Sequence, residues 1–112
     1  MSSMWIRPQN GYPLLHLPID SSSSTIAAVP AISGQIIRVY AIFFVVGGTT
    51  NLTFQNGSTE LTGAMPFVAN GSLTLDNNGN AWAETSAGSA FNILNSGSVQ
   101  VSGTVYYTAG AN

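Results

Sequence analysis

The sequence has no cysteine and no lysine, and its charged side chains are two arginines and four carboxylates in 112 residues. Without cysteine there are no disulfides and no thiolate metal sites. A protein that binds nucleic acid needs a basic patch to neutralise phosphates, and two arginines cannot build one. The composition therefore excludes nucleic-acid partners and thiolate metal sites. We expect no bound metal or cofactor; "DNNGN" at 76–80, which resembles the start of a calcium loop, is interpreted as a turn, with a weakly bound ion as the alternative.

Long hydrophobic runs are also missing. The longest, residues 39–46, has eight apolar or aromatic residues, whereas a membrane-spanning helix needs about 20. Pro8, Pro13 and Pro18 interrupt the N-terminal segment, so we expect no secretory signal there and no membrane association. As a strand, residues 39–46 would extend about 26 Å, enough to cross a small domain.

The low charge predicts a surface made mostly of hydroxyl, amide and small apolar groups. Typical domains carry about 25% charged residues, whereas this chain has 5%. Such a surface is poorly protected from self-association. Either Asn, Ser and Thr keep a single copy soluble, or neighbouring subunits cover much of the exterior; the second interpretation is favoured.

Turn signals recur about every ten residues and separate short segments rich in Val, Ile, Thr, Phe and Tyr. This spacing is typical of an all-β sandwich or barrel. The turn dipeptides are Asn10-Gly11, Ser33-Gly34, Gly47-Gly48, Asn56-Gly57, Asn70-Gly71, Asn78-Gly79, Ala87-Gly88 and Ser96-Gly97. We predict an antiparallel β-sandwich, jelly-roll-like, over residues 26–112.

Several segments alternate between apolar and polar residues, which is the pattern of strands with one solvated face. Leu52 and Phe54 share one face, as do Leu73 and Leu75. In the last segment Gly103 interrupts a long alternating strand, which predicts a bulge or a close backbone approach. Gly47-Gly48 predicts a tight hairpin after the apolar run.

Residues 36–46 differ because both faces are apolar from Ala41 onward. Strict alternation places Phe43 and Val45 on one face, and Ile42, Phe44 and Val46 on the other. A two-layer sandwich covers one face of each sheet. We therefore predict that Ile42, Phe44 and Val46 form a subunit interface, unless the N-terminal segment covers them.

Residues 1–25 are predicted to form an extended, proline-rich arm that ends in a Ser-rich hinge. Prolines at five-residue spacing favour an extended path. The alternative is a first strand folded back on its own domain. The arm residues expected to contact a neighbour or a shell protein are Trp5, Ile6, Tyr12, Leu14, Leu15 and Leu17.

The sequence shows no specific catalytic pattern. His16 is the single imidazole and lies between two leucines, and abundant serine makes any His–acid–Ser match uninformative. Asp76 and Glu84 flank one loop, but two solvated acids are the simpler interpretation. We expect no enzymatic activity. An aromatic platform for sugar stacking, drawn from Trp5, Tyr40, Trp82 and Tyr106, is the alternative binding function.

The order of features over residues 28–107 resembles small β-sandwich proteins of bacteriophage particles. The matching pieces are "SGQIIRVYAIFFVVGGTTNLTFQNGSTELTGAMPFVANGSLTL", "AWAETSAGSAFNIL" and "SVQVSGTVYY". These are packing and turn motifs. The chain lacks the lysines that such proteins carry near the first strand, and residues 1–25 lie outside the match.

The resemblance implies a non-enzymatic virion protein. It would be a decoration (cement) protein on the capsid exterior, or a module of a head fibre or tail. Its expected partners are the major capsid protein and further copies of itself, as a dimer or trimer. The alternative is a carbohydrate-binding module of a fibre or tail.

Overall fold

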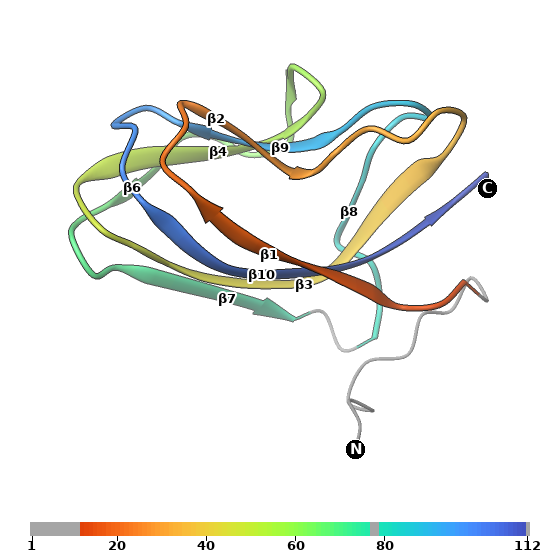
Figure 1. The fold of residues 1–112 in the computed structure, drawn as a ribbon, viewed down its shortest axis with the longest axis horizontal. Helices are drawn as coiled ribbons and strands as arrows, with labels where there is room; N and C mark the ends of the chain where they lie inside the picture. Colours follow the sequence, from red (N-terminus) through yellow and green to blue (C-terminus); the bar gives the residue numbers. More distant parts are fainter. Residues whose placement is uncertain (1–11, 77–78, 112) are drawn as a thin grey trace.

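The computed structural model describes residues 12–76 and 79–111 as two antiparallel sheets packed face to face (Figure 1). Sheet A has the order β1-β10-β3-β7, with β8 also paired to β3; sheet B has the order β2-β9-β4-β5, with β6 also paired to β4. The strands of sheet A are β1 (Leu15–Ser21), β3 (Ile36–Val46), β7 (Ser72–Asp76), β8 (Ala83–Glu84) and β10 (Val101–Gly110). The strands of sheet B are β2 (Thr25–Val29), β4 (Thr50–Asn56), β5 (Thr59–Glu60), β6 (Met65–Phe67) and β9 (Phe91–Asn95).

This order confirms the predicted β-sandwich. The chain passes repeatedly from one sheet to the other, so that β1 and β10 pair in sheet A while β2 and β9 pair in sheet B. Interleaving of early and late strands in two sheets is the arrangement of a jelly roll. The predicted hairpin at Gly47-Gly48 is wrong, because β3 belongs to sheet A and β4 to sheet B. Residues 47–49 cross between the layers.

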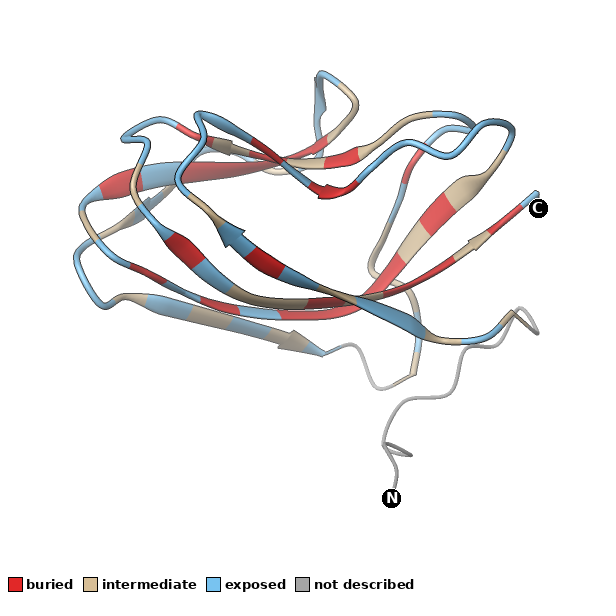
Figure 2. Cartoon of the chain, viewed as in Figure 1, coloured by how far each residue is buried: buried red, intermediate tan, exposed pale blue. Residues whose placement is uncertain are grey.

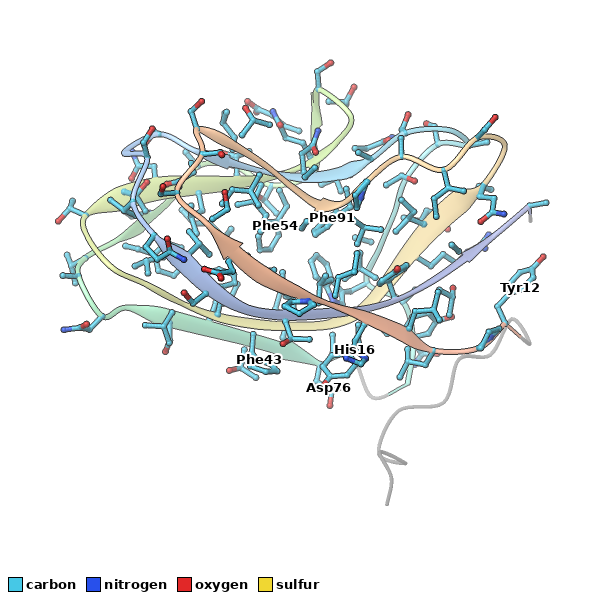
Figure 3. All side chains as sticks on the ribbon, viewed as in Figure 1. Tyr12, His16, Phe43, Phe54, Asp76 and Phe91 are labelled. Carbon is cyan, nitrogen blue, oxygen red and sulfur yellow. The ribbon has the colours of Figure 1, made fainter. Side chains whose placement is uncertain are left out.

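The core lies between the sheets and is built by the alternating residues that the sequence indicates (Figure 2). Phe54 lies at its centre, 5.6 Å from the ring of Phe91 and 6.3 Å from that of Phe44. Figure 3 shows Phe54 and Phe91 pointing into the space between the layers. Burial of these large apolar groups supplies the main stabilisation of the fold.

A β-bulge in β3 decides which of its residues face the core. Ala41 pairs with Tyr106 and Val39 with Tyr107, so Tyr40 is an extra residue in the ladder. The bulge shifts the alternation by one residue. The core-facing residues are therefore odd-numbered before the bulge and even-numbered after it. They are Ile37, Val39, Ile42, Phe44 and Val46.

The structure corrects the predicted boundary at residue 25. Leu15–Ser21 form β1, which pairs along its whole length with β10 at the edge of sheet A. Pro18 is tolerated because β1 is an edge strand, where a missing N–H costs no ladder bond. Residues 15–25 are thus part of the sandwich, which was the alternative interpretation, and residues 1–11 lie outside the described part.

Gly103 confirms the predicted close backbone approach. A Cβ atom at this position would overlap the Phe43 carbonyl oxygen and would lie 2.6 Å from the Phe44 Cα. Only glycine allows β10 to lie this close to β3. Among residues 12–76 and 79–111, no helix has the length and apolar character needed to span a membrane.

Candidate functional site

The outer face of sheet A is the candidate site, because sheet B covers only the inner face. Antiparallel pairing aligns the outward side chains of β1, β10, β3 and β7 in rows. The row nearest the start of β1 is His16, Tyr106, Ala41, Asp76. The next rows are Pro18, Thr104, Phe43, Thr74 and then Asp20, Ser102, Val45, Ser72.

One end of this outer face is covered by the chain itself. Leu14 and Ala81 pack against Tyr40 and Ala41, which are 3% and 4% exposed. The ring of Tyr12 lies against Gly110, where a Cβ would overlap it. The segment that precedes β1 and the loop before β8 together shelter the side chains that the bulge turns outward.

The rest of the outer face is open. Phe43 and Val45 are 44% and 48% exposed, although each is strongly apolar and lies in the middle of the sheet. Figure 3 shows Phe43, like His16 and Asp76, on the side of sheet A that faces away from the core. We call this surface the open face and define it by His16, Pro18, Phe43, Val45, Thr104 and Tyr106.

Three rings of the open face follow one another across neighbouring strands. The centroid of His16 lies 5.9 Å from that of Tyr106, and that of Phe43 lies 6.4 Å from Tyr106. The interplanar angles are 37° and 38°, so the rings are tilted rather than stacked. Such a row presents a continuous aromatic surface to any group that docks on it.

Charge is confined to the edges of the open face. Asp20 accepts a hydrogen bond from Gln100 Nε2 at 2.6 Å, and Asp76 ends β7 on the opposite side. Arg38 is the single Lys or Arg among the described residues, and its Nε lies 3.3 Å from Glu84 Oε1. The open face is therefore apolar at its centre and weakly acidic at its rim.

The predicted subunit interface of Ile42, Phe44 and Val46 is wrong. These side chains are 0%, 1% and 0% exposed and pack in the core between the two sheets. The bulge at Tyr40 is the physical reason, because it turns them inward and turns Phe43 and Val45 outward. The strand does have exposed apolar surface outside the core, but Phe43 and Val45 form it.

The predicted contact residues of the arm separate into several environments. Trp5 and Ile6 lie outside the described residues. Leu14 is half-buried against Tyr40 and Ala41, and Leu17 is half-buried against the core. The contacts of these two leucines are therefore within their own chain.

Tyr12 and Leu15 complete this set. Tyr12 is half-buried beside Gly110, so its ring also serves the fold of its own chain. Leu15, which pairs in register with Tyr107, remains 40% exposed. Leu15 is thus the predicted contact residue with the largest exposed fraction in the described part of the arm.

The three described residues of the aromatic platform predicted for sugar stacking do not lie on one surface, and Trp5 lies outside the described residues. Trp82 packs between the sheets, 5.6 Å from the ring of Phe54 and 6.1 Å from that of Phe91. Tyr40 is buried at the covered end. Of the four aromatic residues, Tyr106 lies on the open face, where its ring neighbours are His16 and Phe43.

Acid–base groups are scattered over the described structure. Residues 12–76 and 79–111 contain no group of three His, Asp or Glu side chains that could hold a metal ion. His16 is exposed and its ring neighbour is Tyr106. The open face thus offers apolar and aromatic contact area rather than a constellation for proton transfer.

Comparison of the chain with protein-family models, with curated proteins and with solved structures gave no match.

Proposed function

We propose that the chain is a non-enzymatic decoration protein of a bacteriophage particle. It would bind the major capsid protein on the outside of the shell through the open face of sheet A. Bound at joints between capsomers, it would add contact area that must be lost before the shell can open. Copies joined to one another on the lattice would bind with high avidity even if each contact is weak.

The observation that carries this proposal is the exposure of Phe43 and Val45 in the middle of a sheet. At the covered end the chain buries its own outer face, because Leu14 packs over Tyr40 and Ala41. The open face is left without such cover by the described residues. Contiguous exposed apolar surface of this kind marks interaction sites.

The composition and the fold support the same class of function. A chain with 5% charged residues has little to oppose close contact with a neighbour. Jelly rolls occur in viral capsid and lectin domains, which is an analogy of fold and not of site. The resemblance to bacteriophage proteins over residues 28–107 adds the class of particle.

Binding of Phe43→Ser to shells of the major capsid protein encoded in the same genome tests the proposal. A Phe side chain has about 200 Å² of surface, so 44% exposure leaves about 90 Å² to bury. At about 25 cal/mol per Å² this contributes about 2 kcal/mol, or roughly 30-fold in affinity. We expect that loss in co-sedimentation with the shells.

Leu61→Ser is the matched control, because Leu61 is 39% exposed and follows β5 in the other sheet. It should bind the shells as the unmodified chain does. Equal binding by the Phe43 and Leu61 variants, at unchanged thermal stability, would contradict the proposal.

Carbohydrate binding is the second candidate, favoured by the row of rings formed by His16, Tyr106 and Phe43. Sugar rings stack on aromatic faces, and the hydroxyls of Thr104 and Thr74 flank Phe43 in the same row. A glycan array probed with the unmodified chain and with Phe43→Ser separates the two candidates. Glycan binding that is lost in the variant, without shell binding by either protein, would replace the first proposal by the second.

A further inference from the structure

Among the edge strands of the described sandwich, β7 is the one without a proline, a register shift or a very short length to block pairing, and its one charged residue, Asp76, is the last of the strand. Natural sheets protect their edges with proline, bulges, charge or very short strands. Here β1 contains Pro18, β6 contains Pro66, β2 has a register shift between Ala27 and Val29, and β5 and β8 have two residues each. In contrast, β7 has five residues, Ser-Leu-Thr-Leu-Asp, without proline or bulge.

The hydrogen-bond pattern shows which backbone groups of β7 point away from the sheet. Val46 donates to the Gly71 carbonyl and accepts from the Asn70 N–H, both at 2.9 Å. Bonded positions alternate along an antiparallel ladder. Leu73 and Leu75 therefore direct their backbone groups to β3, while Ser72 and Thr74 direct theirs outward from the edge of sheet A.

We propose that β7 pairs with β7 of a second copy of this chain, antiparallel, about a two-fold axis at Thr74. Thr74 would then exchange two backbone hydrogen bonds with Thr74 of the other copy. Leu73 would lie opposite Leu75 of the other copy on the inner side, where both side chains are half-buried in the single chain. Threonine pairs and apolar pairs are favourable cross-strand neighbours.

Charge is compatible with this register. Asp76 lies opposite Ser72 of the other copy and not opposite the second Asp76. The two carboxylates are four residues apart along the ladder, or about 13 Å, which exceeds the Debye length of about 8 Å at physiological salt. The strand is therefore complementary to itself in backbone bonds, side-chain size and charge.

Pairing at β7 would also double the contact surface, and this consequence rests on the proposed function. Four strands about 4.8 Å apart and three rows about 6.7 Å apart give the outer face of one copy about 400 Å². A standard stable interface takes about 800 Å² from each partner. Because Phe43 and Val45 lie on β3, next to β7, two paired copies would present one continuous sheet of about that area.

The pairing is tested by cross-linking single-cysteine variants, without any shell present. The chain has no native cysteine, so Thr74→Cys and Ser72→Cys each carry one thiol on the exposed side of β7. In the proposed dimer the two Cα atoms at position 74 lie about 5.5 Å apart, within disulfide range. Those at position 72 lie about 13 Å apart, outside it.

Oxidation with diamide, which takes up the two thiol hydrogens, should link Thr74→Cys at least tenfold faster than Ser72→Cys. Equal rates, or no dimer from Thr74→Cys, would overturn the proposal.

Sedimentation equilibrium gives a second readout. The unmodified chain and Thr74→Ala should associate as concentration rises, and Thr74→Pro, which lacks the outward N–H, should stay monomeric at unchanged thermal stability. Association of Thr74→Pro like that of the unmodified chain would also overturn it.

These results are separable from the proposed function. Cross-linking at position 74 without shell binding would refute the decoration role and leave the strand pairing intact. Shell binding without cross-linking or association would refute the pairing alone.

Discussion

Replacement of Asn95 by alanine should destabilise the fold far more than the loss of so few side-chain atoms suggests. Asn95 is fully buried, and its side chain makes hydrogen bonds to residues at three places where the chain passes between the sheets. Its Oδ1 accepts from the Thr50 hydroxyl at 2.7 Å, and its Nδ2 donates to the carbonyls of Ser23 at 3.1 Å and Val99 at 2.8 Å. Alanine removes all three bonds, of which the one to Thr50 is buried and the other two are partly buried.

At about 1 kcal/mol for each bond, Asn95→Ala should lower the free energy of unfolding by about 3 kcal/mol. For a domain of this size the thermal midpoint should fall by roughly 12–20 °C. Asn92→Ala is the matched control, because Asn92 lies in the same strand and donates once, to the Gly57 carbonyl at 2.9 Å. Its expected cost is about 1 kcal/mol. Thermal and urea unfolding measure both, and an Asn95 variant no less stable than the Asn92 variant would refute the reasoning.

Three further predictions follow from single positions. Gly103→Ala should cost about 3 kcal/mol, because the added Cβ overlaps the backbone of β3 at Phe43; urea unfolding within 0.5 kcal/mol of the unmodified chain would contradict this. Trp82→Phe should cost about 1–2 kcal/mol, from packing lost against Phe54 and Phe91, because the buried indole N–H has no hydrogen-bond partner among the described residues to lose; a cost above about 3 kcal/mol would contradict this. Burial raises the pKa of Tyr107 above 10.0, so its contribution to stability is complete below pH ~10 and is lost as pH rises through the folded-state pKa. Unfolding measured from pH 8 to 11 should show a smaller decline in Tyr107→Phe, and an equal decline would contradict the assignment.

The alternating segments of the sequence were sufficient to predict the two-layer fold. Leu52 and Phe54 are fully buried, and Leu73 and Leu75 are half-buried between exposed neighbours. A period of two residues translates directly into one buried face when nothing shifts the register. This is why the sandwich itself could be predicted from local patterns.

The open face could not be predicted in the same way, because its residues depend on a single extra residue in β3. Val39 and Ile42 both face the core, three residues apart, which strict alternation forbids. The bulge at Tyr40 is determined by pairing with β10, a strand some 60 residues later in the sequence. The local signal of the bulge is the three-residue spacing between the two sets of apolar residues that face the core. That spacing cannot be recognised in a strand whose residues are nearly all apolar.

Prolines misled the interpretation of the N-terminal segment for a related reason. Spaced prolines predict an extended arm, whereas β1 carries Pro18 within a regular edge strand. Proline excludes a central strand but not an edge, and the position of a strand in its sheet is a property of the whole fold. Leu14 and Leu17 consequently pack within their own domain.

The central claim is that the open face of sheet A binds the shell and that the exposed surface of sheet B does not. Hydroxyl-radical footprinting of the chain, free and bound to shells, measures this directly at single side chains. The account predicts strong protection of Phe43 and Val45 on binding, with unchanged labelling of Leu61 and Ile32, which are exposed outside the open face. Labelling of Phe43 and Val45 that stays the same in bound protein would contradict it.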